Sequence, residues 1–323
     1  TPTGLPQPLD FLPDAIYAPG CDERGDTTDA LLEVARKAAQ QAEIAVVFAG
    51  LPDRCESEGF DRDDMKMPAG HLRMIEAVVS ANSNTIVVLL CGSAVECPWA
   101  DRVKAVLYIG LPGQAGGEAI ADLLYGRVNP SGKLAESWPY RYEDVPSSEI
   151  YGKTADALYQ EGVYVGYRYY DKAGVPVRWP FGYGLSYTTF AFSDLTVEDN
   201  SISVTVKNTG SFAGAEVAQL YVNAPQDGLH RPLRELKGFR KVFLQPGESQ
   251  TVTFPLTDRS FAVWQDGWKI PAGTYTVCIG GLRAEIEKNG DVLPVPAWQG
   301  GRWDGRCSGK PNRADWEAML GRT

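Results

Sequence analysis

Histidine is nearly absent from this chain: only His71 and His230 occur among its 323 residues. A Ser-His-Asp triad needs a histidine beside its serine, so the sequence disfavours an esterase built on Ser131 or Ser186. The six cysteines show no CxxC spacing, and with so few histidines a structural zinc site is disfavoured. We interpret the cysteines as free thiols, with pairing of the third and fourth in an oxidising compartment left open: Cys21, Cys55, Cys91, Cys97, Cys278 and Cys307.

Long apolar runs and an excess of positive charge are also missing. The longest apolar runs, such as residues 85–91, fall well short of the ~20 residues that span a bilayer. A net charge of -10 argues against nucleic acid and anionic membranes as partners. Residues 1–6 lack the features of a signal peptide and an initiator methionine, so we expect a cut or processed piece. A cytoplasmic location is the preferred expectation, with a secreted or periplasmic one as the alternative.

The first part of the chain alternates between helical and strand-like patterns. Thr28 and Asp29 are positioned to cap a helix, and apolar strand-like runs occupy residues 44–50, 85–91 and 104–110. Helical patterns at residues 71–81 and 116–125 lie between and after these runs. Such alternation with uniformly apolar strands predicts an α/β sandwich domain with a mainly parallel sheet, which we assign to residues 1–140.

The remainder of the chain has a different pattern of polar and apolar residues. Residues 141–189, rich in tyrosine and glycine, are interpreted as an ordered connecting segment that packs on both domains. Alternation with a period of two then predicts an all-β fibronectin type III-like (immunoglobulin-like) sandwich over residues 190–290, followed by a tail or interdomain linker at 291–323 that ends in a short helix at 313–320. The strands are expected at residues 201–207, 216–222, 236–243, 250–254, 260–264 and 274–279.

The loop after the 44–50 strand carries the strongest candidate chemistry, because residues 56–63 read Glu-Ser-Glu-Gly-Phe-Asp-Arg-Asp. Loops at the carboxyl ends of parallel strands open into a crevice where ligands bind. Gly59 lets the backbone turn sharply after Glu58, and Asp61 and Arg62 can form an ion pair that holds the loop. From the residues alone, a solvated acidic loop is the preferred interpretation. Neither an EF-hand nor any other metal spacing is present, so no cation site is expected.

The same loop resembles the acid/base loop of glycoside hydrolase family 3, through Glu56, Glu58, Gly59, Asp61 and Arg62. The resemblance covers about residues 15–290 and implies a retaining β-glucosidase-like enzyme that needs no cofactor. The general acid/base maps best to Glu58, with Glu56 as the second candidate because loop length varies in the family. Other segments that match the family are residues 17–21, 82–89, 112–126, 129–134, 161–171 and 181–188.

Glycines and aromatic residues in the matching segments have a structural interpretation. Gly113, Gly116 and Gly117 lack the pattern of a dinucleotide site, and we expect them to let a helix approach the sheet. The tyrosines are expected mainly to pack the domain interface, with a sugar-stacking role as the alternative.

The chain also departs from the family. The family's nucleophile is an Asp in a Ser-Asp-Trp-like motif on a (β/α)₈ barrel, and this motif has no counterpart here. The most similar stretch of sequence contains Asp194 and falls in the predicted sandwich. The strand that opens the family's α/β domain is missing as well. Residues 314–322 resemble the linker of members with reversed domain order, in which the barrel comes last.

The sequence therefore predicts part of a retaining glycosidase that hydrolyses terminal β-linked glucose or related sugars. In this interpretation, the chain supplies the acid/base carboxyl group and is catalytically incomplete alone. Its partners would be a β-glycoside substrate and a barrel domain or chain, and a homo-oligomer is left open. The alternative is a non-catalytic two-domain module that binds sugar or protein.

Overall fold

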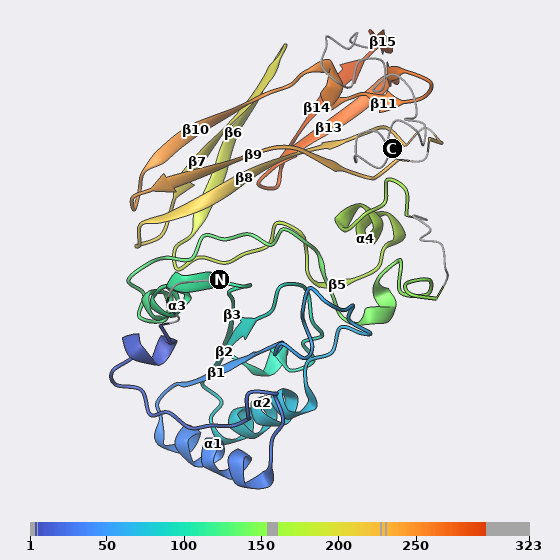
Figure 1. Cartoon of the computed structure of the whole chain (residues 1–323). Helices are drawn as coiled ribbons and strands as arrows, with labels where there is room; N and C mark the ends of the chain where they lie inside the picture. The colour runs from blue at the N-terminus through green and yellow to red at the C-terminus, as the bar shows by residue number, and fades with distance from the viewer. Residues whose placement is uncertain (1–3, 5, 154–160, 227, 230, 295–323) are drawn as a thin grey trace.

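The computed structural model describes residues 4, 6–153, 161–226, 228–229 and 231–294. Figure 1 shows two bodies along the chain: an α/β portion built from the blue and green segments, and a β-sandwich built from the yellow and orange ones. The predicted short helix at 313–320 lies outside the described residues. In the described part of the chain, every helix is too short or too polar to cross a membrane.

The α/β portion centres on a parallel sheet in the order β1-β2-β3. Helices α1 and α2 pack side by side below this sheet, while α3 lies on the side toward the sandwich (Figure 1). Buried side chains of α1, α2 and the strands form one apolar core. The elements are η1 (Pro8–Phe11), α1 (Asp29–Gln41), β1 (Ala45–Gly50), α2 (Ala69–Ala81), β2 (Thr85–Leu90), η2 (Ala100–Arg102), β3 (Ala105–Tyr108), η3 (Gly113–Ala115) and α3 (Gly116–Leu124).

Local polar groups define the ends of these helices. The Thr28 hydroxyl accepts a hydrogen bond from the Leu31 N–H, so the predicted cap of α1 is confirmed. Asn82, directly after α2, donates to the carbonyl groups of Ala39 and Ala42 at the end of α1. This amide ties the two helices together and sets the entry into β2.

The connecting segment contains regular structure that the sequence pattern did not predict. Its elements are β4 (Trp138–Pro139), η4 (Tyr142–Asp144), α4 (Tyr167–Ala173) and β5 (Val177–Trp179), and β4 pairs with β5. The fully buried Trp138 donates its indole N–H to the Val95 carbonyl group at 2.6 Å. This contact fastens the segment to the loop after β2.

The sandwich consists of two antiparallel sheets that pack face to face. One has three strands in the order β10-β7-β6, and the other has four in the order β14-β13-β8-β9. Alternate residues of both sheets point inward to a second apolar core that includes Val204, Leu220 and Tyr275. The strands are β6 (Phe190–Glu198), β7 (Ser201–Asn208), β8 (Gly214–Asn223), β9 (Glu235–Leu244), β10 (Ser249–Pro255), β11 (Val263–Trp264), β12 (Trp268–Ile270), β13 (Gly273–Ile279), β14 (Leu282–Lys288) and β15 (Asp291–Leu293), with η5 (Asp258–Ser260) before β11.

Polar contacts join the two bodies. The Asn129 amide group donates to the Ala213 carbonyl group in the sandwich. It accepts hydrogen bonds from Ser186 and Tyr187 in the connecting segment. Lys133 pairs with Glu216 at 2.9 Å, with both side chains largely shielded from solvent. The two portions are therefore tied directly, and by more than the chain that connects them.

Three expectations need correction. The predicted strand at residues 260–264 is mostly the turn of η5, and only β11 at its end is strand. The predicted strands did not include β6, β12, β14 or β15, and β15 lies within the residues assigned to the tail. Gly117 does not serve an approach of α3 to the sheet: a Cβ there would meet the Pro6 carbonyl oxygen at 2.6 Å, so the glycine admits the N-terminal segment instead.

Candidate active site

The loop between β1 and α2 lies at the carboxyl edge of the sheet. The neighbouring loop after β2 begins at the same edge because the two strands are parallel and in register, with Gly50 opposite Leu90. The end of β1 is further fixed by His71 on α2, whose Nδ1 lies 3.0 Å from the Gly50 carbonyl oxygen. The sheet therefore brings both loops to the same edge; the sequence predicted this position for the acidic loop and made no prediction for the loop after β2.

Glu56 anchors the acidic loop to the loop after β2. Its two carboxylate oxygens accept the Gly92 N–H at 3.0 and 2.8 Å. A Cβ at position 92 would stand 2.8 Å from the Glu56 Oε1 atom, so the glycine makes this close contact possible. Glu56 is thus already engaged with the backbone, which weakens its candidacy as the proton donor.

Arg62 forms a second anchor between the same two loops. Its Nη1 atom donates to the Ser93 hydroxyl at 2.7 Å and to the Ala94 carbonyl oxygen at 3.3 Å. The expected Asp61–Arg62 ion pair is not among those of the described residues. Asp61 instead accepts from the Tyr151 hydroxyl, which raises the pKa of that phenol. The expectation failed because each side chain finds a different partner far along the chain.

Glu58 stands at the tip of this loop. Ser57 and Phe60 form an isolated antiparallel bridge, which places Glu58 and Gly59 in the turn between them. Glu58 is exposed to solvent. Gly59 does not have the positive φ that would require glycine, and a Cβ there would come no closer than 4.0 Å to Ser57. The turn therefore does not depend on Gly59 for backbone freedom, contrary to our expectation, and the missing side chain leaves open space beside Glu58.

A cavity of about 870 Å³ opens next to this turn and extends under the connecting segment. Glu58 and Gly59 are not among its lining residues, although Ser57 and Phe60 on either side of them are. Glu136 also lines the cavity, and the sequence pattern did not predict it as a site residue. Burial raises the pKa of its carboxyl group, while Arg62 opposes that shift. Its segment carries no local motif that would have marked it. The lining includes Ser57, Phe60, Arg62, Glu136, Tyr151 and Tyr167.

Other chemistry is poorly supported in the described residues. They contain no group of three or more His, Cys, Asp or Glu side chains placed to hold a metal ion. Cys91 and Cys97 are both free thiols there, and burial raises the pKa of each to about 12. A nucleophilic cysteine needs the opposite shift.

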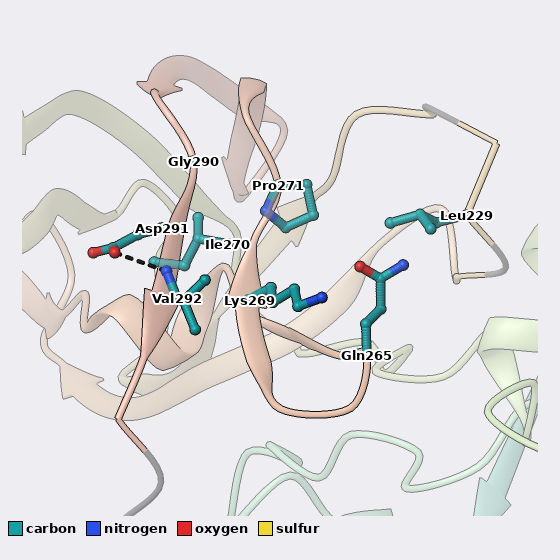
Figure 2. Close-up of a pocket in the computed structure, with 8 residues that line it drawn as sticks. All are labelled: Leu229, Gln265, Lys269, Ile270, Pro271, Gly290, Asp291 and Val292. Atoms are coloured by element: carbon teal, nitrogen blue, oxygen red, sulfur yellow. Dashed lines mark hydrogen bonds between the residues drawn. The ribbon is translucent and has the colours of Figure 1, made fainter.

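Figure 2 shows a separate hollow in the sandwich, of about 640 Å³, beside β12 and β15. Among the described residues, its one lining carboxyl group is that of Asp291, which accepts a hydrogen bond from the Val292 N–H of its own strand. Lys269 and Gln265 are the other polar side chains on its wall. This hollow lies in the sandwich, away from the carboxyl edge of the parallel sheet where Glu58 stands, so the turn at Glu58 is the better candidate.

Comparison with known proteins agrees with this architecture. The Glycosyl hydrolase family 3 C-terminal domain matches residues 3–167, and the Fibronectin type III-like domain matches residues 216–282. The chain belongs to glycoside hydrolase family 3, and the predicted fold class is confirmed. The individual domain boundaries that we assigned stay predictions.

Several relatives are similar over most of this chain. Thermostable beta-glucosidase B of Acetivibrio thermocellus is 50% identical over 284 residues, which are 84% of this chain and 38% of the relative. Exo-alpha-(1->6)-L-arabinopyranosidase of Bifidobacterium breve is 41% identical over 328 residues, covering 94% of this chain and 43% of that protein. The crystal structure of a Bifidobacterium adolescentis GH3 beta-glucosidase matches with a TM-score of 0.86 at 40% identity, covering 93% of this chain and 48% of that one. The chain thus spans less than half the length of these relatives.

Proposed function

We propose that this chain is the acid/base-bearing part of a retaining β-glucosidase-like enzyme. Glu58 protonates the departing glycosidic oxygen in the first step and removes a proton from water in the second. The nucleophile comes from a barrel domain or chain, which also holds the sugar in the reacting position. The substrate is a terminal β-linked glucoside or a related sugar.

One observation carries this proposal: Glu58 is the carboxylate at the tip of a turn whose base is anchored at two points. Glu56 is hydrogen-bonded to Gly92 and Arg62 to Ser93, which leaves Glu58 as the carboxylate of the turn without such an anchoring contact in the described residues. A general acid must be held at a fixed place and still reach its substrate, and an exposed side chain on a fixed turn meets both needs. The names of the relatives support β-glucosides and, as related sugars, L-arabinopyranosides.

The exposure of Glu58 also favours a second candidate, a non-catalytic module that binds sugar or protein. A general acid works in a site from which bulk water is excluded. Under the main proposal, the barrel partner covers Glu58 and provides that exclusion. Under the second candidate, the group stays solvated and has no part in a reaction.

A chimaeric enzyme separates the two candidates. The matched portion of Thermostable beta-glucosidase B, 38% of that protein, is replaced by this chain, and activity on β-glucosides is measured with and without Glu58→Gln. For a poor leaving group such as the sugar of cellobiose, we expect kcat/KM to fall by roughly 10²–10⁴-fold. For 2,4-dinitrophenyl β-glucoside, whose departure needs no proton, the glycosylation step should be nearly unchanged. Azide should then accelerate turnover by attacking the covalent intermediate.

The control is Asp63→Asn, which removes another exposed carboxyl group of the same loop. It should behave like the parent chimaera on both substrates. A folded, inactive chimaera, or one in which Glu58→Gln leaves cellobiose hydrolysis intact, would reject the acid/base role. The unmodified chain alone is expected to be inactive on all these substrates.

A further inference from the structure

The loop after β2 touches the acid/base turn at both of its ends. Gly92 donates its N–H to Glu56, two residues before Glu58. Ser93 accepts from the Arg62 Nη1 atom at 2.7 Å, four residues after Glu58. Two consecutive residues of one short loop therefore hold the segment on which the exposed carboxylate stands.

This loop is itself firmly placed. It follows β2, whose residues Val87–Leu89 are fully buried at the centre of the sheet. Ala94 is buried, and Val95, with no exposed surface, accepts the Trp138 indole N–H. A loop fixed by a central strand on one side and a buried tryptophan on the other is a rigid support for the turn that carries Glu58.

The guanidinium group of Arg62 depends strongly on Ser93. Its Nη2 atom is buried without a hydrogen-bond partner in the described part of the structure, so Nη1 makes its polar contacts there. The Ser93 contact is the shorter of the two, and the Ala94 carbonyl oxygen is 3.3 Å away. Without the Ser93 hydroxyl, the cation would keep one long hydrogen bond, and a buried charged donor with few partners is costly.

We propose that Ser93 is a positioning residue for the acid/base reaction. Its hydroxyl holds Arg62 and, with the neighbouring Gly92–Glu56 contact, fixes where Glu58 stands. The inference rests on the proposed function of Glu58, through which Ser93 acts. Ser93 itself does not touch the reacting atoms in this assignment.

The test compares Ser93→Ala with Ser93→Thr in the chimaeric enzyme. Alanine removes the hydroxyl acceptor, and threonine keeps it. Because a misplacement of about 1 Å can cost 10²-fold in rate, we expect Ser93→Ala to lower kcat on cellobiose by roughly 10–100-fold. KM should be unchanged, because the barrel holds the sugar. The kcat/KM for 2,4-dinitrophenyl β-glucoside should change by less than about 2-fold, since it reports the first step, in which this leaving group needs no acid.

Ser93→Thr should restore most of the cellobiose activity, and Ser80→Ala on the exposed part of α2 is the matched control with parent activity. All variants should melt within about 3 °C of the parent. If Ser93→Ala does not fold, Arg62→Lys tests the same contact, because it removes the guanidinium group that donates to the Ser93 hydroxyl. We expect the same selective loss of activity on cellobiose.

Two results would overturn the inference: parent-like cellobiose activity of Ser93→Ala, or an equal loss on both substrates. The second would mean general damage to the fold. Failure of the acid/base proposal is distinguishable, because it shows as a Glu58→Gln variant that hydrolyses cellobiose normally. If Glu58→Gln acts as expected while Ser93→Ala does not, only the positioning role is wrong.

Discussion

Glu56 receives the backbone N–H of Gly92 on both of its carboxylate oxygens, at 3.0 and 2.8 Å. This contact crosses from the loop after β1 to the loop after β2 and closes the base of the turn that carries Glu58. It also separates the two acidic candidates of the loop: one is committed to the backbone, and the other is exposed.

Replacing Glu56 should therefore affect the reaction differently from replacing Glu58. We expect Glu56→Ala in the chimaeric enzyme to lower kcat/KM for cellobiose by roughly 10–100-fold, because the turn that carries Glu58 loses an anchor, with kcat/KM for 2,4-dinitrophenyl β-glucoside little changed and no rescue by azide. The free energy of unfolding should fall by about 1 kcal/mol, the usual contribution of such a hydrogen bond. Glu43→Ala, at the opposite end of β1, serves as the control. Rescue of Glu56→Ala by azide would instead identify Glu56 as the acid/base.

Gly50 at the end of β1 should tolerate no side chain. A Cβ there would lie 1.7 Å from the Leu90 carbonyl oxygen of the adjacent strand, which cannot move without breaking the sheet. We expect Gly50→Ala to destabilise the chain by about 2–3 kcal/mol, in the range of overpacked cores. Chemical denaturation measures this loss against Gly132→Ala, where a Cβ meets nothing within 4 Å. Equal stability of the two variants would contradict the close approach.

The thiols of Cys91 and Cys97 should resist alkylation in the native protein. Both are buried, and burial raises the pKa of each to about 12, so the reactive thiolate is scarce at pH 8. Mass spectrometry after iodoacetamide treatment should find both unmodified until guanidinium chloride unfolds the chain. Modification within minutes under native conditions would mean that this core opens easily.

Stability should decline on mild acidification because of His71. Burial lowers the pKa of this imidazole below its ordinary 6.5, so the native state prefers the neutral ring. The unfolded chain then binds the proton more tightly, and the free energy of unfolding falls as the pH drops through 6.5 toward the lowered value. Denaturation curves at several pH values should show a smaller decline for His71→Gln. An unchanged slope in that variant would assign the effect to other groups.

Local pattern was sufficient for much of the fold. The apolar runs located β1, β2 and β3, and Thr28 marked the start of α1. Strand β6 escaped notice because its register shifts between Ser193 and Thr196, where Asp194 has a φ of 54° and interrupts the alternation. Strand β14 alternates between partly buried and exposed residues, so its sequence pattern is sufficient to predict it.

The candidate site was only half visible in the sequence. The position of Glu58 after a parallel strand and its family motif were readable, and its catalytic role stays a prediction. The partners of Arg62 were not readable, because Ser93 lies 31 residues further along the chain and carries no motif of its own. Contacts between loops of neighbouring strands depend on how the strands pair, and short-range patterns do not contain that information.

Asn129 has a practical consequence for protein engineering. Its amide oxygen accepts hydrogen bonds from the connecting segment, and its amide nitrogen donates one to the sandwich. Gly214 leaves room for this amide, since a Cβ at position 214 would stand 2.6 Å from the Asn129 Nδ2 atom. A hybrid that borrowed only the α/β portion would strand this amide against a foreign surface. The two bodies are best transplanted together, as one exchangeable cassette.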